Sequence, residues 1–392
     1  METEIYLDHA ATTPLRPSAQ DYLRECIAKD ELCGNSSGSH LIARRAKNAL
    51  EEARERIANI LGVSPSEVIF TSGGTESNNL AIRGVMEVSD RLDQTNSLES
   101  RNNRLVYSAT EHHSVLNLSR QLGGEMCRAN PDGTIDLNYL ESIIDSNSRL
   151  ISVMLANNET GVVNDLSEVD KIIQRQAPQC VLHSDAVQAF PCLDIGLVAK
   201  CAQSFTLAAH KFGGPKGVGF LIVKKGTKLV PQMLGGGQEF EKRAGTQNVP
   251  MVVASVLAAE EAYNEREIES RRIWELRNVF VSSIDKLIPG TYHIGHGTQR
   301  VPGIINIRFD GVNNEELLVL LDRNGVFASS GASCASGATE PSHVLCAMGF
   351  TTDQARSSLR FSLGWTTQQE ELEQAAALIA DQVAQLRVQL RA

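Results

Sequence analysis

The sequence predicts an α/β protein with a large domain built on a mostly parallel, doubly wound sheet and a smaller α+β C-terminal domain. Short apolar runs alternate with longer amphipathic stretches over roughly the first two thirds of the chain. This alternation is typical of parallel strands joined by crossover helices. It stops near Ala258, where a long helical pattern begins. At 392 residues the chain is also too long for one ordinary compact core.

The strands of the large sheet are expected at six apolar runs. They are residues 68–70, 105–108, 150–155, 181–184, 204–208 and 219–223. Ahead of them, residues 41–61 carry apolar side chains at helical spacing, and Gly62 follows as a stop signal. Residues 89–104 are polar and poor in apolar side chains, so we expect a surface insertion there.

The second part of the chain is expected to be organised differently. Its predicted elements are a long helix at 260–287, a strand at 304–309, a helix at 314–323 and a final helix at 368–390. We expect the N-terminal arm to pack with this part. The predicted domains are therefore residues 14–257 for the large, cofactor-binding domain, and residues 1–13 with 258–392 for the small one.

Composition narrows the possible partners and the location. A hydrophobic content of 42% with 21% charged residues is typical of a globular chain. The net charge of −10 argues against nucleic acid as the main partner. No apolar stretch reaches membrane-spanning length, and residues 1–4 lack the features of a secretory signal. We expect a cytoplasmic protein with no membrane partner.

The eight cysteines are irregularly spaced and form no C-x-x-C pair, so neither a zinc site nor a disulfide framework is expected. Most are expected to be buried apolar side chains, and Cys346, in an apolar helical run, is expected in the core. Cys334 differs because it lies among Ser, Gly and Ala residues with little apolar anchorage. We expect this segment to be a mobile loop and Cys334 to be reactive.

Two residues at the ends of predicted strands indicate the chemistry. Asp185 follows the run 181–184, and Lys211 follows the run 204–208. Ligands of open α/β sheets bind at the carboxyl ends of the strands. A pyridoxal-phosphate enzyme needs a lysine to hold the cofactor aldehyde as a Schiff base. It also needs a carboxylate that keeps the pyridine nitrogen protonated.

Weaker signals follow the other runs. A glycine turn containing Gly74 and Thr75 opens a helix, where free N–H groups and the helix dipole favour a phosphate. It is not a Walker loop or a G-x-G-x-x-G motif, and an ordinary capped turn is the alternative. One of the adjacent histidines His112 and His113 could stack on an aromatic cofactor or merely pack. An amide of the pair Asn157-Asn158 could bond a phenolic oxygen, or the segment could form a turn. Together these residues would meet at one edge of the sheet.

With these motifs in place, the chain resembles the cysteine desulfurases. These form part of the class V aminotransferase-like branch of fold type I pyridoxal-phosphate enzymes. The resemblance covers essentially the full length. It is carried by residues 6–14, 34–35, 71–77, 157–159, 184–188, 209–211, 243–246, 329–334 and 358–362. The Ser-Ser-Gly segment before Cys334 is similar to the type that serves iron–sulfur assembly and nitrogen fixation.

The resemblance implies roles by position. The cofactor-binding residues would be Gly74, Thr75, His112, Asn158, Asp185, Gln188, His210, Lys211 and Thr246. Among them Gly74, Thr75 and His210 would hold the phosphate. His112 would stack on the ring, and Asn158 and Gln188 would face its phenolic oxygen. Thr246 would reach the phosphate of a neighbouring subunit, which implies a homodimer with shared sites. Arg360 would clamp the substrate carboxylate, assisted by Asn35 and Asn158.

The implied reaction removes sulfur from L-cysteine and releases L-alanine. Lys211 would remove the α-proton and His112 would help to move protons. Cys334 would take the sulfur as a persulfide and pass it to an acceptor such as an iron–sulfur scaffold protein. One position departs from the family, because Ala208 stands where a Ser usually contacts the phosphate. Losing that hydrogen bond would cost about 1.5–3 kcal/mol, unless a hydroxyl such as that of Thr206 compensates.

Several alternatives stay open at the level of sequence. A selenocysteine lyase or a cysteine lyase could use the same scaffold. A hypothesis from a different functional class is that the chain acts mainly as a docking partner in a sulfur relay and has only weak catalysis. An ordinary aminotransferase has no need for a cysteine in a mobile loop. The acceptor is not identified either, since iron–sulfur assembly, tRNA thiolation and DNA sulfur modification all begin with a persulfide.

Overall fold

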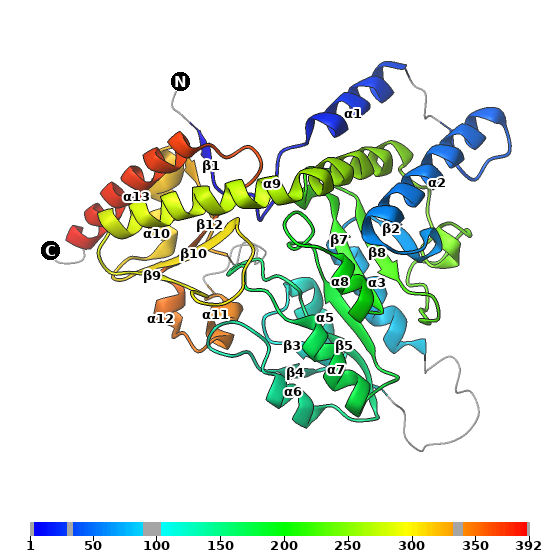
Figure 1. The fold of residues 1–392 in the computed structure, drawn as a ribbon, viewed down its shortest axis with the longest axis horizontal. Coiled ribbons are helices and arrows are strands. Elements are labelled where there is room, and N and C mark those ends of the chain that lie inside the picture. The colour runs from blue at the N-terminus through cyan, green and yellow to red at the C-terminus, as the bar shows by residue number, and fades with distance from the viewer. Residues whose placement is uncertain (1–3, 30–33, 89–102, 332–339, 390–392) are drawn as a thin grey trace.

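The computed structural model describes residues 4–29, 34–88, 103–331 and 340–389, and it is built around a seven-stranded sheet (Figure 1). The strands lie in the order β2-β8-β7-β6-β5-β3-β4. Neighbouring strands are parallel except where β8 pairs with β2 and β7. Their bounds are β2 Val68–Thr71, β3 Arg104–Ser108, β4 Glu125–Cys127, β5 Ser148–Ser152, β6 Val181–Asp185, β7 Ser204–Ala208 and β8 Gly219–Val223.

The predicted mostly parallel sheet is confirmed, and all six predicted runs are strands. The sequence did not indicate β4, because this edge strand is three residues long and its Met126 is 43% exposed. Without a buried apolar run it gives no strand signal. Most of the insertion expected at 89–104 lies outside the described residues.

Helices cover both faces of the sheet (Figure 1). Apolar side chains of α3 and α5 pack on one face, while those of α2, α7 and α8 pack on the other. The side chains of successive strand residues point to opposite faces of the sheet. Ile69 packs on the face covered by α3, and Phe70 packs on the face covered by α2. The bounds are α1 Pro17–Lys29, α2 Leu41–Leu61, α3 Gly74–Met86, α5 His113–Gln121, α6 Leu137–Ile143, α7 Leu166–Gln176 and α8 Gly196–Cys201.

The long helix α9 (Val249–Leu287) joins the two parts of the molecule (Figure 1). It begins at Val249 and not at residue 260 as predicted. Val252 belongs to the core of the large sheet, whereas Phe280 belongs to a second core made with the C-terminal elements. The boundary proposed at 257/258 falls inside this helix, so the division into domains stays a prediction.

The second core lies between α9, α13 and two small sheets. β10 pairs antiparallel with β9 and β12, and β1 pairs parallel with β11. The elements are β1 Ile5–Tyr6, β9 Thr291–His293, β10 Ile304–Phe309, α10 Asn314–Arg323, β11 Val326–Phe327, α11 His343–Ala347, α12 Thr352–Ala355, β12 Ser358–Ser362 and α13 Gln369–Gln389. Three short 3₁₀ turns complete the described elements: η1 Pro65–Glu67, η2 Ala209–Lys211 and η3 Glu239–Glu241.

The helix predicted at 314–323 and the strand predicted at 304–309 are confirmed with the same bounds. The expectation that Cys346 lies in the core is wrong, because this cysteine is exposed. It lies in the short helix α11, whose buried side is formed by Val344 and Leu345. None of the helices in the described ranges combines the length and apolar character needed to cross a lipid bilayer.

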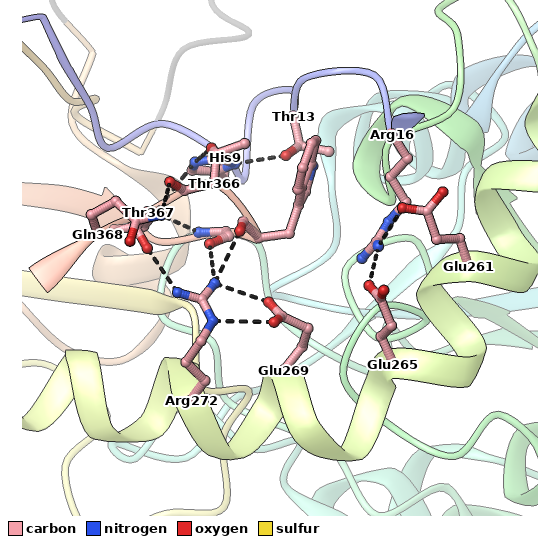
Figure 2. A network of polar contacts seen from close by, with 12 residues as sticks. His9, Thr13, Arg16, Glu261, Glu265, Glu269, Arg272, Thr366, Thr367 and Gln368 are labelled. Carbon is pink, nitrogen blue, oxygen red and sulfur yellow. Dashed lines mark hydrogen bonds and ion pairs between the residues drawn. The ribbon is translucent and has the colours of Figure 1, made fainter. Parts of the chain in front are cut away.

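The N-terminal arm is fixed to α9 by polar contacts, which Figure 2 shows. Arg16 forms ion pairs with Glu261 and Glu265 of α9, at 3.4 and 2.6 Å. Farther along the same helix, Arg272 donates to Glu269 and to the carbonyl oxygen of Thr367. The Arg16 pairs hold the arm against α9, whereas the Arg272 contacts join α9 to the segment before α13. The arm also passes the carboxyl ends of the large sheet, where the N–H of Thr13 donates to the carbonyl oxygen of His210.

Candidate active site

A cavity of about 360 Å³ lies at the carboxyl ends of the parallel strands. Nine of the residues expected at the site line it: Gly74, Thr75, His112, Asn158, Asp185, Gln188, His210, Lys211 and Arg360. Ala208 lines it as well. The topology explains this convergence, because the segments after β2, β3, β5, β6 and β7 all emerge at one edge of the sheet.

Lys211 is the last residue of η2, immediately after β7. Its Nζ donates to the carbonyl oxygens of Ala10 and Ala11, at 2.5 and 2.8 Å. The Nε2 of Gln188 donates to the same Ala10 oxygen at 2.8 Å. The N-terminal arm therefore forms one wall of the cavity and positions the lysine amine in it.

Asp185 ends β6 and its side chain is buried, with 3% of the residue exposed. The carboxylate accepts from the backbone N–H of Val187 at 3.0 Å and from Nδ2 of Asn78 at 2.8 Å. Both of these groups are donors, so the carboxylate oxygens act as acceptors in both bonds. Asp185 is thus held as an acceptor facing the cavity.

His112 is the N-cap residue of α5, and its Nδ1 accepts from the backbone N–H of Ser114 at 3.1 Å. The Oγ of Ser114 lies 2.8 Å from the same nitrogen. Burial lowers the pKa of His112 and nearby Lys211 lowers it further, while Asp185 opposes them. The ring is therefore neutral near pH 7, and an accepting Nδ1 places its proton on Nε2.

The N-terminus of α3 forms the opposite end of the cavity. A Cβ on Gly74 would lie 3.2 Å from the Cγ2 of Val187, so the backbone approaches closely there. Among the described residues, Nδ1 of His210 is buried without a hydrogen-bond partner, and burial lowers the pKa of this imidazole to about 4. The hydroxyl of Thr206 is buried and unpartnered too, but Thr206 does not line the cavity. The wall thus offers no evident replacement for a Ser at position 208.

Arg360 lies in the middle of β12 and its side chain is 3% exposed. It donates through Nη2 to Asp8 at 2.6 Å and through Nη1 to the backbone oxygen of Asn158 at 3.1 Å. Its Nε is buried and has no partner among the described residues. The guanidinium is therefore fixed in direction and retains donors for an anion.

Two of the expected site residues are not at this cavity, and the position of a third is not described. Asn35 and Thr246 are exposed and do not line it. They lie on neighbouring segments, since Ser36 and Gln247 are joined by a hydrogen bond of 2.6 Å. Cys334 falls outside the described residues. Assistance by Asn35 to Arg360 of its own chain is therefore not seen.

Sequence reasoning missed the polar residues behind the cavity wall. Asp8 lies inside a motif that was interpreted only as a whole, and Asn78 directly follows the motif at 71–77. His183 lies within a run taken as an ordinary apolar strand. A histidine in the middle of a buried strand was an available signal, because such a group must find hydrogen-bond partners.

Comparisons with known proteins agree with this geometry. The profile described as "Aminotransferase class-V" matches residues 5–375. The cysteine desulfurase IscS of Dictyoglomus turgidum is 38% identical over 99% of this chain and 96% of its own length. An IscS-like cysteine desulfurase of Mycobacterium tuberculosis is 38% identical, with 97% of each chain covered. A solved structure titled "NifS-like protein" superimposes with a TM-score of 0.87 at 29% identity, covering 97% of this chain and 100% of that one.

Members of this family use pyridoxal 5′-phosphate, and the residues of the cavity fit that group. A lysine amine is available for the aldehyde and a buried carboxylate for the ring nitrogen. The α3 N-terminus and the unpartnered Nδ1 of His210 suit a phosphate. The full-length match and the assembled cavity lead to one conclusion: this chain belongs to the class-V aminotransferase family and, within it, to the cysteine desulfurases.

Proposed function

We propose that this chain is a pyridoxal-phosphate-dependent enzyme that removes sulfur from L-cysteine, releases L-alanine and retains the sulfur as a persulfide on Cys334. The observation that carries the proposal is the convergence of Lys211, Asp185 and Arg360 on one cavity. An amino-acid substrate presents an amine, a carboxylate and an α-hydrogen. The cavity holds an arginine for the carboxylate and a lysine that could remove the α-hydrogen, and the aldehyde of the cofactor held by that lysine would take the amine.

The cofactor would be held at three points. Lys211 would bind the aldehyde covalently, and Asp185 would accept a hydrogen bond from the ring nitrogen. Gly74, Thr75 and His210 would surround the phosphate. His112 would lie against the ring, with Gln188 and Asn158 near its phenolic oxygen. When bound, pyridoxal 5′-phosphate supplies an electron sink for the substrate α-carbon.

The chain's own groups account for substrate binding and proton transfer. Arg360 binds the substrate carboxylate with donors that Asp8 and Asn158 leave free. Lys211, once released from the cofactor, takes the α-proton as a base. His112 is neutral at physiological pH and donates from Nε2, so it suits transient proton donation on the cavity side.

Sulfur transfer requires a nucleophile, and Cys334 is the residue we assign. Its thiolate attacks the substrate sulfur and a new S–S bond forms while the C–S bond breaks. The carbon keeps the electron pair of the broken bond and takes up a proton, which yields alanine. The expectation rests on the sequence around Cys334, because this residue lies outside the described ranges.

The direct test is alanine formation by the purified holoenzyme from L-cysteine without any keto acid. We expect stoichiometric alanine and a persulfide on Cys334 that Cys334→Ser abolishes. Lys211→Ala should lose the covalently bound chromophore. Transfer that requires a keto acid would indicate an aminotransferase. If the purified chain bound no cofactor and turned over no cysteine, the remaining hypothesis would be that it is a docking partner in a sulfur relay. Comparing the turnover of selenocysteine with that of L-cysteine distinguishes a selenocysteine lyase from a cysteine desulfurase.

The sites would be shared in a homodimer, with Thr246 serving the neighbouring subunit. The exposure of Thr246 and its absence from the cavity of its own chain support this arrangement. Mixing Lys211→Ala chains with Thr246→Ala chains tests it. If Thr246 acts across the interface, each hybrid dimer has one intact site and activity returns. If Thr246 acts in its own chain, no hybrid site is complete.

The persulfide would be passed to an acceptor protein, for which we propose an iron–sulfur scaffold protein in the cytoplasm. Relatives named IscS support this choice. Labelling Cys334 with radioactive sulfur and following the label into candidate acceptors distinguishes this from tRNA thiolation and DNA sulfur modification. Transfer of label to a thiolation protein in preference to a scaffold protein would contradict it.

A further inference from the structure

We propose that Asn78 is a positioning residue that sets the hydrogen-bonding roles of both Asp185 and His112. The inference rests on the proposed function, in which these two residues contact opposite features of the cofactor ring. Asn78 lies on α3 and is completely buried. It does not line the cavity, so it acts only through its neighbours.

All three polar contacts of the Asn78 amide are satisfied. Nδ2 donates to Oδ2 of Asp185 at 2.8 Å and to Oγ of Ser114 at 2.9 Å. Oδ1 lies 3.1 Å from Nε2 of His183. One side chain therefore bonds to the carboxylate, to the hydroxyl beneath His112 and to a buried imidazole.

The orientation of this amide follows from Asp185. Rotating the amide by half a turn would place its oxygen against the carboxylate, where only a donor is favourable. With Nδ2 facing Asp185, Oδ1 must accept from His183. A buried polar group without a partner costs about 1–3 kcal/mol, so the orientation with every bond made is strongly preferred.

His183 fixes the orientation of the Asn78 amide through its own hydrogen bonds. Its Nε2 must carry the proton that Asn78 accepts, and its Nδ1 lies 2.7 Å from Oγ of Ser204, which donates to it. Burial lowers the pKa of His183 to about 3, so the ring is neutral and holds one tautomer. All four residues of the chain Ser204–His183–Asn78–Asp185 are at most 3% exposed.

The second hydrogen bond that Asn78 donates connects it, through Ser114, to His112. Because Ser114 Oγ accepts from Asn78, its hydroxyl proton is free to point to Nδ1 of His112, 2.8 Å away. Nδ1 also accepts from the Ser114 backbone N–H. His112 is thereby held with its proton on Nε2. A single amide thus keeps Asp185 an acceptor and, acting together with the backbone N–H of Ser114, keeps His112 a donor.

The experiment compares Asn78→Ala and Ser114→Ala with Asn79→Ala as the matched control. Asn79 is the next residue on the same helix, but within the described ranges its amide bonds only to the backbone oxygen of Thr75. Histidine tautomers are read by nitrogen NMR on ¹⁵N-histidine-labelled protein before cofactor is added. The visible absorption band of the holoenzyme is then titrated against pH.

We expect Nε2–H tautomers for His112 and His183 in the wild type and in Asn79→Ala. Asn78→Ala should give mixed tautomers at both rings and move the pH midpoint of the visible band by about one unit, the equivalent of one charge-assisted hydrogen bond. Ser114→Ala should change the tautomer of His112 alone and leave the pH midpoint of the visible band unchanged. If Asn78→Ala does not fold, the nearly isosteric Asn78→Asp, which cannot donate to Asp185 when ionised, takes its place.

Wild-type tautomers and an unshifted band in the Asn78 variant would overturn the inference. So would an Nδ1–H tautomer of His112 in the wild type. Failure of the proposed function looks different: no alanine would form from L-cysteine, while the tautomers, measured without cofactor, would remain as described.

Discussion

The guanidinium of Arg360 is bonded to the carboxylate of Asp8, with 2.6 Å between Nη2 and Oδ1. This pair joins β12 to the N-terminal arm at the mouth of the cavity, and Asp8 is the more exposed partner, with 20% of its side chain exposed. A substrate carboxylate that binds Arg360 must share this cation with Asp8. If Arg360 binds the substrate carboxylate as proposed, the arm would influence substrate affinity through Asp8.

Replacing Asp8 by Asn should tighten the binding of carboxylates. Asn keeps an oxygen that accepts from Arg360 but removes the competing negative charge, whose effect is weakened by its partial exposure. We expect KM for L-cysteine and the inhibition constant of L-alanine to fall severalfold. L-alaninamide, which lacks the carboxylate, is the control and should bind unchanged. A rise in KM would show that Asp8 serves mainly to orient the guanidinium.

Ala208→Ser should strengthen cofactor binding. Ala208 lines the cavity at its phosphate end, and its Cβ lies 3.6 Å from the position that a Cβ on Gly74 would take. A hydroxyl there adds one hydrogen bond to a charged group, worth about 1.5–3 kcal/mol. The dissociation constant of pyridoxal 5′-phosphate, measured by titration of the apoprotein, should fall at least about tenfold. Ala208→Cys, which is close to Ser in shape but is only a weak donor, should improve it much less.

The η3 turn stores backbone strain that a glycine would relieve. Glu239, Phe240 and Glu241 all have positive φ, at 49°, 57° and 63°. A residue with a Cβ in this region costs about 1–2 kcal/mol. Glu239 forms a buried ion pair with Arg54 at 2.8 Å, which holds the turn in place. We expect Glu241→Gly to raise the thermal midpoint by a few degrees. Glu241→Ala keeps the strain and should not, and equal shifts in both variants would contradict this explanation.

Glu111 should make the protein less stable as pH rises. Its carboxyl is completely buried, and burial, with Asp185 adding to it, raises the pKa from 4.5 to about 8. The folded state therefore holds a proton that the unfolded state has released between these values. Stability from this group is full below pH 4.5 and is lost as pH rises through 8.

Glu111→Gln, which cannot ionise, should remove this contribution to the pH dependence. The difference in unfolding free energy between the variant and the wild type should change by roughly 2–4 kcal/mol across the window. Denaturant unfolding at the two ends of the window measures it. A difference that is independent of pH would mean that Glu111 is ionised in the folded protein at both ends.

The paired residues Lys211 and Asp185 could be found from sequence because each directly follows a run of apolar residues. A parallel sheet then brings such positions to one edge, whatever the details of packing. The strand β12 could not be found in this way. Its residues Ser358–Ser362 alternate polar and apolar side chains, which is compatible with a strand, but Arg360 lies within that strand and does not follow an apolar run. Only the pairing of β12 with β10 fixes where Arg360 lies. Cys346 shows the opposite failure, since an apolar neighbourhood in sequence did not bury its side chain.

The sequence by itself determined the fold class, the cofactor chemistry and most of the residues around the cavity. Local pattern and strand-end position carry the fold class and the pairing of Lys211 with Asp185, because both depend on neighbours along the chain. The resemblance to the cysteine desulfurases supplies the remaining site residues. Only the tertiary structure decided how Asn78 joins Asp185 to His112 and how Asp8 shares Arg360. Asn78 and Asp185 are 107 positions apart, and Asp8 and Arg360 are 352 apart. Such contacts exist only after the sheet, the arm and the second core have packed together, so no local pattern records them.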